Sequence, residues 1–215
     1  MAIPEVVLSE EIHRIGPNAV TRVAEALRAR LPADEVARLF ALAGLETYLR
    51  DPPQRMVDER EVTRLHWTLR EELGVPRALE VAGQAGVLTG DYLLAHRIPA
   101  PIQRLLAFLP AAWASRVLID AIRRHSWTFS GSGELRVRKA YPPELAIAGC
   151  CICLGAESDV PLCAFYRAAI ERLFRALVHP RAVVAETGCQ AQGAEACTFR
   201  VTSRSSTIRC GGSRK

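Results

Sequence analysis

Three cysteines and one glutamate near the end of the chain have the residue types and the spacing of a metal site. Cys163 comes first, Glu186 and Cys189 lie three residues apart, and Cys197 follows eight residues later. Thiolates and a carboxylate are ligands that zinc accepts in a closed tetrahedral site. Such a short pattern fits a metal site and fits scattered core thiols, so the residues alone leave both alternatives open.

The other cysteines lie in one tight group and in the final residues. Cys150, Cys151 and Cys153 are near neighbours, and adjacent residues of a strand point to opposite faces. We therefore expect them to pack as small buried hydrophobic side chains rather than to share one metal. Cys210 is expected to be inert. An odd total of seven cysteines favours metal ligands or free thiols over disulfides.

Composition indicates a folded protein with a real core. The 215 residues are 49% hydrophobic, and the net charge of +5 comes mostly from arginine. Basic residues are not grouped with stacking aromatics, so no nucleic-acid partner is expected. The first residues lack a secretory signal, and every long apolar run is broken by prolines or charges, so no transmembrane segment is expected. We expect a cytoplasmic protein, with peripheral membrane association as an option.

Hydrophobic periodicity divides the chain into a helical portion and a mixed portion. Three-and-four spacing predicts helices, and alternation predicts strands. The predicted helices cover residues 19–31, 34–49, 58–73, 77–96, 103–124 with an interruption at Pro110, and 161–178. The predicted strands cover residues 127–129, 135–139, 182–187 and 197–202, and residues 144–154 fit either a short strand or a buried loop.

These elements predict an α+β fold. Residues 1–125 would form a helical N-terminal portion, and residues 126–203 an antiparallel-sheet unit with the order hairpin, helix, hairpin. We expect the two portions to form one continuous domain, with residues 204–215 as a flexible tail. The sequence shows no internal repeats.

Two groups of motifs resemble known families. Cys163-x-Phe165, Glu186-Thr-Gly-Cys189 and Glu195-Ala-Cys-Thr-Phe199 resemble the signature of the 4-vinyl reductase domain family. Upstream, Thr89-Gly-Asp-Tyr-Leu-Leu94 and Trp127-Thr-Phe129-Ser-Gly-Ser-Gly133 resemble the J protein family of purple-bacterial bacteriochlorophyll biosynthesis. The second resemblance extends from the first helix to about Thr202.

The resemblance implies a metal, a substrate class and a pathway. By similarity to the sensor members of the domain family, Cys163, Glu186, Cys189 and Cys197 would be zinc ligands. The family acts at, or supports, reduction of the 8-vinyl (4-vinyl) group of a divinyl (proto)chlorophyllide, which is a magnesium tetrapyrrole. The chain has no dinucleotide fingerprint and no recognisable flavin site, so the sequence does not identify an electron donor.

A chlorin ligand needs a flat apolar slot, an axial ligand and polar anchors. The expected ligand-binding residues are Gly86, Tyr92, His96, Trp127 and Phe129. Gly86 belongs to a helical glycine run that fits close helix packing equally well. Trp127 and Phe129 also fit an ordinary core.

Two functions follow as alternatives. The protein either acts as a divinyl chlorophyllide vinyl reductase or a helper of that enzyme step, or it is a non-catalytic module for sensing, carrying or scaffolding. Its expected partners are the tetrapyrrole itself, a second copy in a homodimer and other pigment-synthesis enzymes. Zinc with four protein ligands is redox-inert and has no open position, which favours binding or delivery over self-sufficient reduction.

Overall fold

A four-stranded antiparallel sheet and the helices on one of its faces make up the described part of the chain. The computed structural model describes residues 13–203, so the expected tail and Cys210 lie outside the described residues. The sheet has the order β3-β4-β6-β5. Its strands are β3 (Glu134–Ala140), β4 (Pro143–Ala148), β5 (Ala182–Gly188) and β6 (Cys197–Ser203). A small second pair joins β1 (Arg14–Ile15) to β2 (Val57–Asp58).

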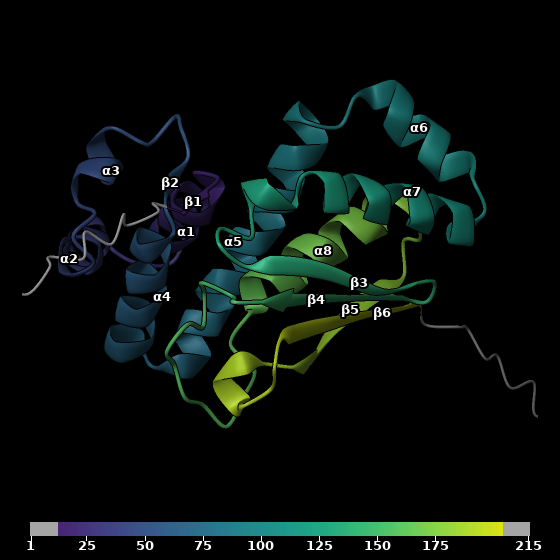
Figure 1. The fold of residues 1–215 in the computed structure, drawn as a ribbon. Helices are drawn as coiled ribbons and strands as arrows, with labels where there is room; N and C mark the ends of the chain where they lie inside the picture. The colour runs from purple at the N-terminus through teal and green to yellow at the C-terminus, as the bar shows by residue number, and fades with distance from the viewer. Residues whose placement is uncertain (1–12, 204–215) are drawn as a thin grey trace, which may run out of the picture.

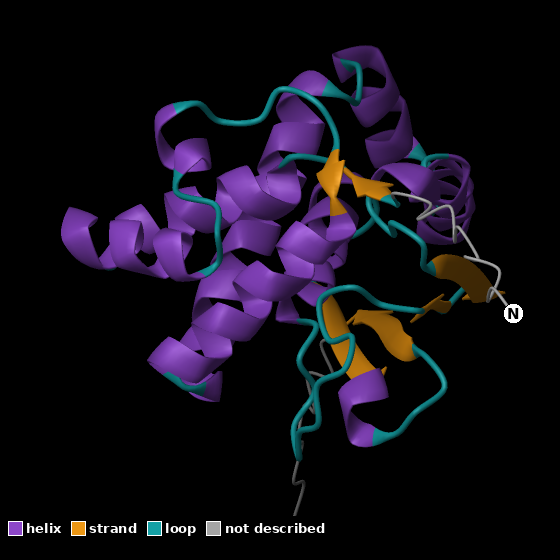
Figure 2. Cartoon of the chain, turned by 60° about the vertical axis from the view of Figure 1, so that its left-hand side comes forward, coloured by secondary structure: helices purple, strands orange, loops and turns teal. Residues whose placement is uncertain are grey.

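Eight α-helices and two 3₁₀ turns precede, separate or cover these strands in residues 13–203 (Figures 1 and 2). The helices are α1 (Asn18–Arg28), α2 (Ala33–Leu42), α3 (Thr47–Arg50), α4 (Glu59–Leu73), α5 (Val75–His96), α6 (Ala100–Phe108), α7 (Ala111–Arg124) and α8 (Ala164–Leu177). The 3₁₀ turns are η1 (Ser126–Thr128) and η2 (Gln190–Gln192). The α+β fold expected from periodicity is confirmed.

Alternation gives the sheet one apolar and one polar face. Leu145 and Phe199 are fully buried opposite one another on β4 and β6. On the same strands Glu144 faces Arg200, and the two side chains form an ion pair at 3.2 Å. Because an antiparallel sheet needs only one covered face, the helices gather on the apolar side. Figure 1 shows α8 along that face, with α5 behind it and α7 beside β3.

The packing of α5 on α8 is the most extensive contact between two helices, and a glycine makes it possible. A Cβ added at Gly86 would lie 2.2 Å from the backbone oxygen of Phe165. Only a residue without a side chain allows the two backbones to approach so closely. Of the two interpretations of Gly86, close helix packing is the one that the structure describes.

Two expected elements are wrong in detail. Residues 127–129 are not a strand, because the 3₁₀ turn η1 and the backbone bond from the Ser130 amide to the Ser126 carbonyl (2.9 Å) curl this segment. The partner of β3 is β4, joined to it by the turn at Pro142. The helix expected over residues 34–49 is divided into α2 and α3 at Gly44, whose φ of +70° is incompatible with a continuing helix.

The start of α4 is fixed to the loop before β3. Asp58 caps the helix by accepting a 2.8 Å hydrogen bond from the Arg60 amide. The next residue, Glu59, is only 7% exposed, and its carboxylate accepts a 2.6 Å hydrogen bond from the Ser132 amide. The buried carboxylate therefore joins the helical portion to the sheet.

We expect Glu59→Ala to lower the free energy of unfolding by about 1–3 kcal/mol, because the Ser132 amide would lose its charged acceptor and a buried side chain would be removed. Chemical denaturation with fluorescence detection measures this difference. Glu71→Ala, an exposed change on the same helix, is the control and is expected to stay within about 0.5 kcal/mol of the parent. Equal stability of the two variants would contradict the structural role of Glu59.

Candidate metal centre

Five buried thiols and one carboxylate gather where the first turn of α8 meets the sheet. Cys150, Cys153, Cys163, Cys189 and Cys197 are each at most 1% exposed. The Sγ of Cys163 lies 3.3 Å from that of Cys150 and 3.3 Å from that of Cys197. The Sγ of Cys197 lies 3.4 Å from Cys153 and 3.9 Å from Cys189. Such a cluster can hold a metal ion.

Each donor is positioned by the end of a secondary-structure element. Cys163 is the N-cap residue of α8, Cys189 follows β5 directly, and Cys197 is the first residue of β6. Cys150 and Cys153 lie on a series of turns after β4. These turns begin at Gly149, whose φ is +70°. Helix and strand ends bring together residues that are distant in sequence, which periodicity alone does not show.

Backbone amides point at the sulfur and oxygen donors. The Leu162 amide donates to the Sγ of Cys189 at 3.4 Å, and the Gln190 amide donates to the Sγ of Cys197 at 3.4 Å. The Cys163 amide donates to one carboxylate oxygen of Glu186 at 3.0 Å. Hydrogen bonds of this kind favour the anionic forms of their acceptors, which are the forms that bind metals.

The second carboxylate oxygen of Glu186 is buried and has no hydrogen-bond partner in the described part of the chain. Burial, and then the charge of Cys189, raises the pKa of Glu186 to about 9. A carboxylate at this position therefore needs a nearby positive charge to stay ionised at neutral pH. The unpartnered oxygen and the surrounding thiols fit a divalent metal ion.

The donors form two overlapping sets of four. The side chains that the sequence singled out, Cys163, Glu186, Cys189 and Cys197, have donor atoms within 4.8 Å of one another. A second set of the same compactness consists of Cys150, Cys153, Cys163 and Cys197. Four ligands at the usual zinc–sulfur distance are about 3.8 Å apart in a tetrahedron. Both sets therefore have nearly the dimensions of a zinc site.

Cys150 and Cys153 are buried, as the sequence predicts. Of the two expectations for residues 144–154, a short strand or a buried loop, the loop applies to these two cysteines, and both point into the thiol cluster. Strand alternation therefore does not prevent this pair from sharing a metal. Cys151 is the member of the group that points elsewhere, with its Sγ 3.7 Å from the Tyr166 hydroxyl. The spacing Cys150-x-x-Cys153 is typical of zinc sites and was the signal available in the sequence.

A partly buried arginine from the helical portion lies beside the thiol cluster. Arg70 of α4 donates to the Ile152 carbonyl at 3.0 Å, and its second terminal nitrogen is buried without a hydrogen-bond partner among the described residues. Burial lowers the pKa of Arg70, and the neighbouring Cys153, Cys163 and Cys189 act against that shift. The guanidinium thus supplies positive charge next to anionic sulfurs, a role that no sequence pattern indicated.

The expected ligand-binding residues are not gathered into one slot. Tyr92 and His96 stack at 4.9 Å between ring centroids, and Arg97 lies over the Tyr92 ring at 5.9 Å. Phe129 contacts Tyr166 edge-on inside the core, whereas Trp127 is 61% exposed on η1. No ring contact or hydrogen bond joins the Tyr92–His96 pair to Trp127 or Phe129 within residues 13–203.

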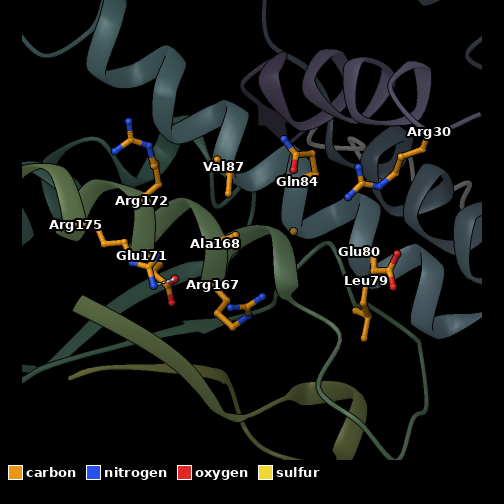
Figure 3. A pocket seen from close by; sticks show the side chains of 11 residues that line it. Arg30, Leu79, Glu80, Gln84, Val87, Arg167, Ala168, Glu171, Arg172 and Arg175 are labelled. Carbon is orange, nitrogen blue, oxygen red and sulfur yellow. Dashed lines mark ion pairs between the residues drawn. The ribbon is translucent and has the colours of Figure 1, made fainter. Parts of the chain in front are cut away.

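A hollow of about 390 Å³ lies along the contact between α5 and α8 (Figure 3). Arg172 is paired with Asp91 at 2.6 Å, and Arg175 with Glu171 at 2.8 Å. The hollow is lined by four arginines, two glutamates and a few other polar, apolar or small residues: Arg30, Leu79, Glu80, Gly83, Gln84, Val87, Arg167, Ala168, Glu171, Arg172 and Arg175.

Two guanidinium groups of the hollow are available to a ligand. No acidic side chain among residues 13–203 pairs with Arg30 or Arg167. Two arginines without acidic partners, beside apolar side chains, are suited to a ligand that has an apolar body and a carboxylate. The sequence does not predict this site, although Arg167, Arg172 and Arg175 all lie on α8.

The fold and the cysteine cluster define the class of protein. Residues 143–203, which contain every proposed metal donor, match the model of the 4-vinyl reductase domain family. The resemblance of the motifs to this family is thereby confirmed.

Two relatives extend this similarity over most of the chain. The bacteriochlorophyll synthase 23 kDa chain of Cereibacter sphaeroides is 44% identical over 191 residues, covering 88% of this chain and 90% of the relative. The protein of the same name from Rhodobacter capsulatus is 34% identical over 186 residues, covering 86% and 85% respectively. The chain belongs to the family of the bacteriochlorophyll synthase 23 kDa chain.

Within residues 13–203, no helix is both long enough and apolar enough to cross a bilayer.

Proposed function

We propose that this protein acts in bacteriochlorophyll biosynthesis by binding a magnesium tetrapyrrole, such as a divinyl (proto)chlorophyllide, and supporting reduction of its 8-vinyl group. The observation that carries the proposal is the pair of arginines without an acidic partner, Arg30 and Arg167, in a hollow of a chain that belongs to this family. The carboxylate of the macrocycle would meet the guanidinium groups, and its ring would cover the apolar side chains.

The metal has a structural part in this proposal. Zinc held by Cys163, Glu186, Cys189 and Cys197 would join the start of α8 to β5 and β6. It would thereby hold α8, which carries Arg167 and the floor of the hollow, at a fixed position on the sheet. Because such a zinc ion has four protein ligands and no redox chemistry, the electrons for the reduction come from a separate donor.

Binding of the pigment can be measured with the purified protein. Titration with magnesium divinyl chlorophyllide, followed by the shift of its absorption bands, is expected to show saturable binding. We expect Arg167→Ala to weaken binding by about tenfold to a hundredfold, because a charge-assisted hydrogen bond contributes about 1.5–3 kcal/mol. Arg104→Ala, an exposed change on α6 outside the hollow, is the matched control.

The outcomes separate binding, pathway and catalysis. Absence of chlorin binding, together with binding of small aromatics or a partner protein, would favour a sensing or scaffolding module. Deletion of the gene in a pigment-producing host is expected to alter pigment amount or the ratio of divinyl to monovinyl pigment. Unchanged pigments would contradict the pathway role. Incubation with divinyl substrate and each nicotinamide tests reduction by the protein itself.

A further inference from the structure

We propose that the thiol cluster holds two zinc ions rather than one, with the thiolates of Cys163 and Cys197 bridging them. One ion would have Glu186 and Cys189 as its other ligands. The second would have Cys150 and Cys153, which the proposed function does not use. This inference rests on the metal site of the proposed function and extends it.

The geometry of the donors carries the inference. The six donor atoms form two four-membered sets that share one edge, the Cys163–Cys197 pair, whose sulfurs lie 3.3 Å apart. Cys150 approaches one end of this edge at 3.3 Å, and Cys153 approaches the other end at 3.4 Å. Two tetrahedra that share an edge are the arrangement of a metal pair joined by two bridging ligands.

The neighbourhood of Cys150 and Cys153 is built for anionic sulfur. The Cys150 amide is held by the side-chain oxygen of Gln190 at 2.8 Å, which fixes the start of the turn that carries both cysteines. Arg70 donates to the carbonyl of Ile152, between them in sequence, and has a buried terminal nitrogen with no hydrogen-bond partner in the described residues. A partly buried cation with one unpartnered nitrogen is matched by a cluster with residual negative charge.

The net charge of the metal and its ligands is the same with one zinc ion as with two. One Zn²⁺ with three thiolates and one carboxylate has a net charge of −2. A second Zn²⁺ binds as the thiols of Cys150 and Cys153 release their protons to solvent, and the net charge is again −2. The second ion therefore replaces two buried neutral thiols with metal–sulfur bonds and adds no charge to the core.

The distances favour bare metal ions over an iron–sulfur cluster. Neighbouring sulfurs in the thiol cluster are 3.3–3.9 Å apart. This separation fits the edge of about 3.8 Å expected for ligands around a single ion. Iron atoms with inorganic sulfide between them would require the cysteines to lie further apart.

Zinc stoichiometry of the full-length protein tests the proposal. Native mass spectrometry and elemental analysis of protein produced with added zinc are expected to give two zinc ions per chain. The double variant Cys150→Ser/Cys153→Ser is expected to retain one ion and a folded circular dichroism spectrum. Glu186→Gln/Cys189→Ser is likewise expected to retain one. Cys151→Ser is the matched control with two ions, because its thiol points at Tyr166.

Cobalt gives a second signature that depends on bridging. The first Co²⁺ added to metal-free protein is expected to produce an electron paramagnetic resonance signal, and the second to diminish it, because bridging thiolates couple the two spins. A signal that grows steadily with both additions would overturn the bridge.

The outcomes distinguish this inference from the proposed function. One zinc ion in the parent protein, unchanged in Cys150→Ser/Cys153→Ser, overturns the second site and leaves the first intact. Acid-labile sulfide with iron overturns the zinc pair. No bound metal in any preparation overturns both metal sites, whereas pigment binding is measured separately.

Discussion

Cys197→Ser is expected to abolish metal binding and to lower the free energy of unfolding by more than about 4 kcal/mol, since loss of a structural metal is among the few single changes with so large an effect. The sulfur of Cys197 lies within 3.9 Å of Cys153, Cys163 and Cys189 and belongs to both sets of donors. Zinc content and thermal unfolding, each with and without chelator, measure the effect.

Cys151→Ser is the control for this prediction. Its thiol is as buried as the others but lies near Tyr166 rather than in the thiol cluster. We expect it to retain its zinc and to unfold at a temperature that falls on chelation, as in the parent protein. A Cys197→Ser variant with full zinc content, or a parent protein insensitive to chelation, would show that the thiol cluster is ordinary core.

Gly86→Ala is expected to lower the free energy of unfolding by about 3 kcal/mol, although alanine is normally the better helix former. Its Cβ would lie 2.2 Å from the Phe165 carbonyl oxygen and 3.0 Å from the Ala168 Cβ. Because the closest atom belongs to the backbone, relief requires α5 and α8 to separate. Denaturant unfolding monitored by circular dichroism measures the loss.

Gly83→Ala, one turn earlier on α5, is a stringent control. The closest contact of its added Cβ would be the end of the flexible Arg167 side chain at 3.9 Å. We expect this variant to gain about 0.5–1 kcal/mol, because alanine restricts the unfolded chain more than glycine does. Loss of stability in both variants would indicate that α5 does not tolerate substitution in general. If neither variant loses stability, the close packing of α5 on α8 is contradicted.

Periodicity predicts the helices and the closing strands of this fold well. The helices α4 and α8 and the strands β5 and β6 have long, regular patterns, because one side of each element is buried. The error at residues 127–129 arises because three residues are too few to distinguish alternation from a turn. The division of α2 from α3 occurs at Gly44, whose positive φ ends the helix in a local cap, with the Leu45 amide donating to the Phe40 carbonyl at 2.8 Å.

The candidate site was only partly predictable. Cys163, Glu186, Cys189 and Cys197 were found through their spacing and through resemblance to a family. For Cys150 and Cys153 the sequence leaves a short strand and a buried loop open, because nothing local indicates that the positive φ of Gly149 begins a series of turns. Arg30 follows the first helix and Arg167 lies on the last, and two residues so distant in sequence that line one hollow leave no periodic signal.

The edge strand β3 has a consequence for how two copies of the protein can meet. β3 exposes Arg136, Arg138 and Lys139 to solvent, and Ser115 of α7 donates a 2.8 Å hydrogen bond to its Ala140 carbonyl. Positive charge along an edge strand repels the same strand of a second copy. A carbonyl that already accepts a hydrogen bond is also less available to the amides of that second strand. These features disfavour pairing of β3 with the same strand of a second molecule, whereas β5 is the other edge of the sheet.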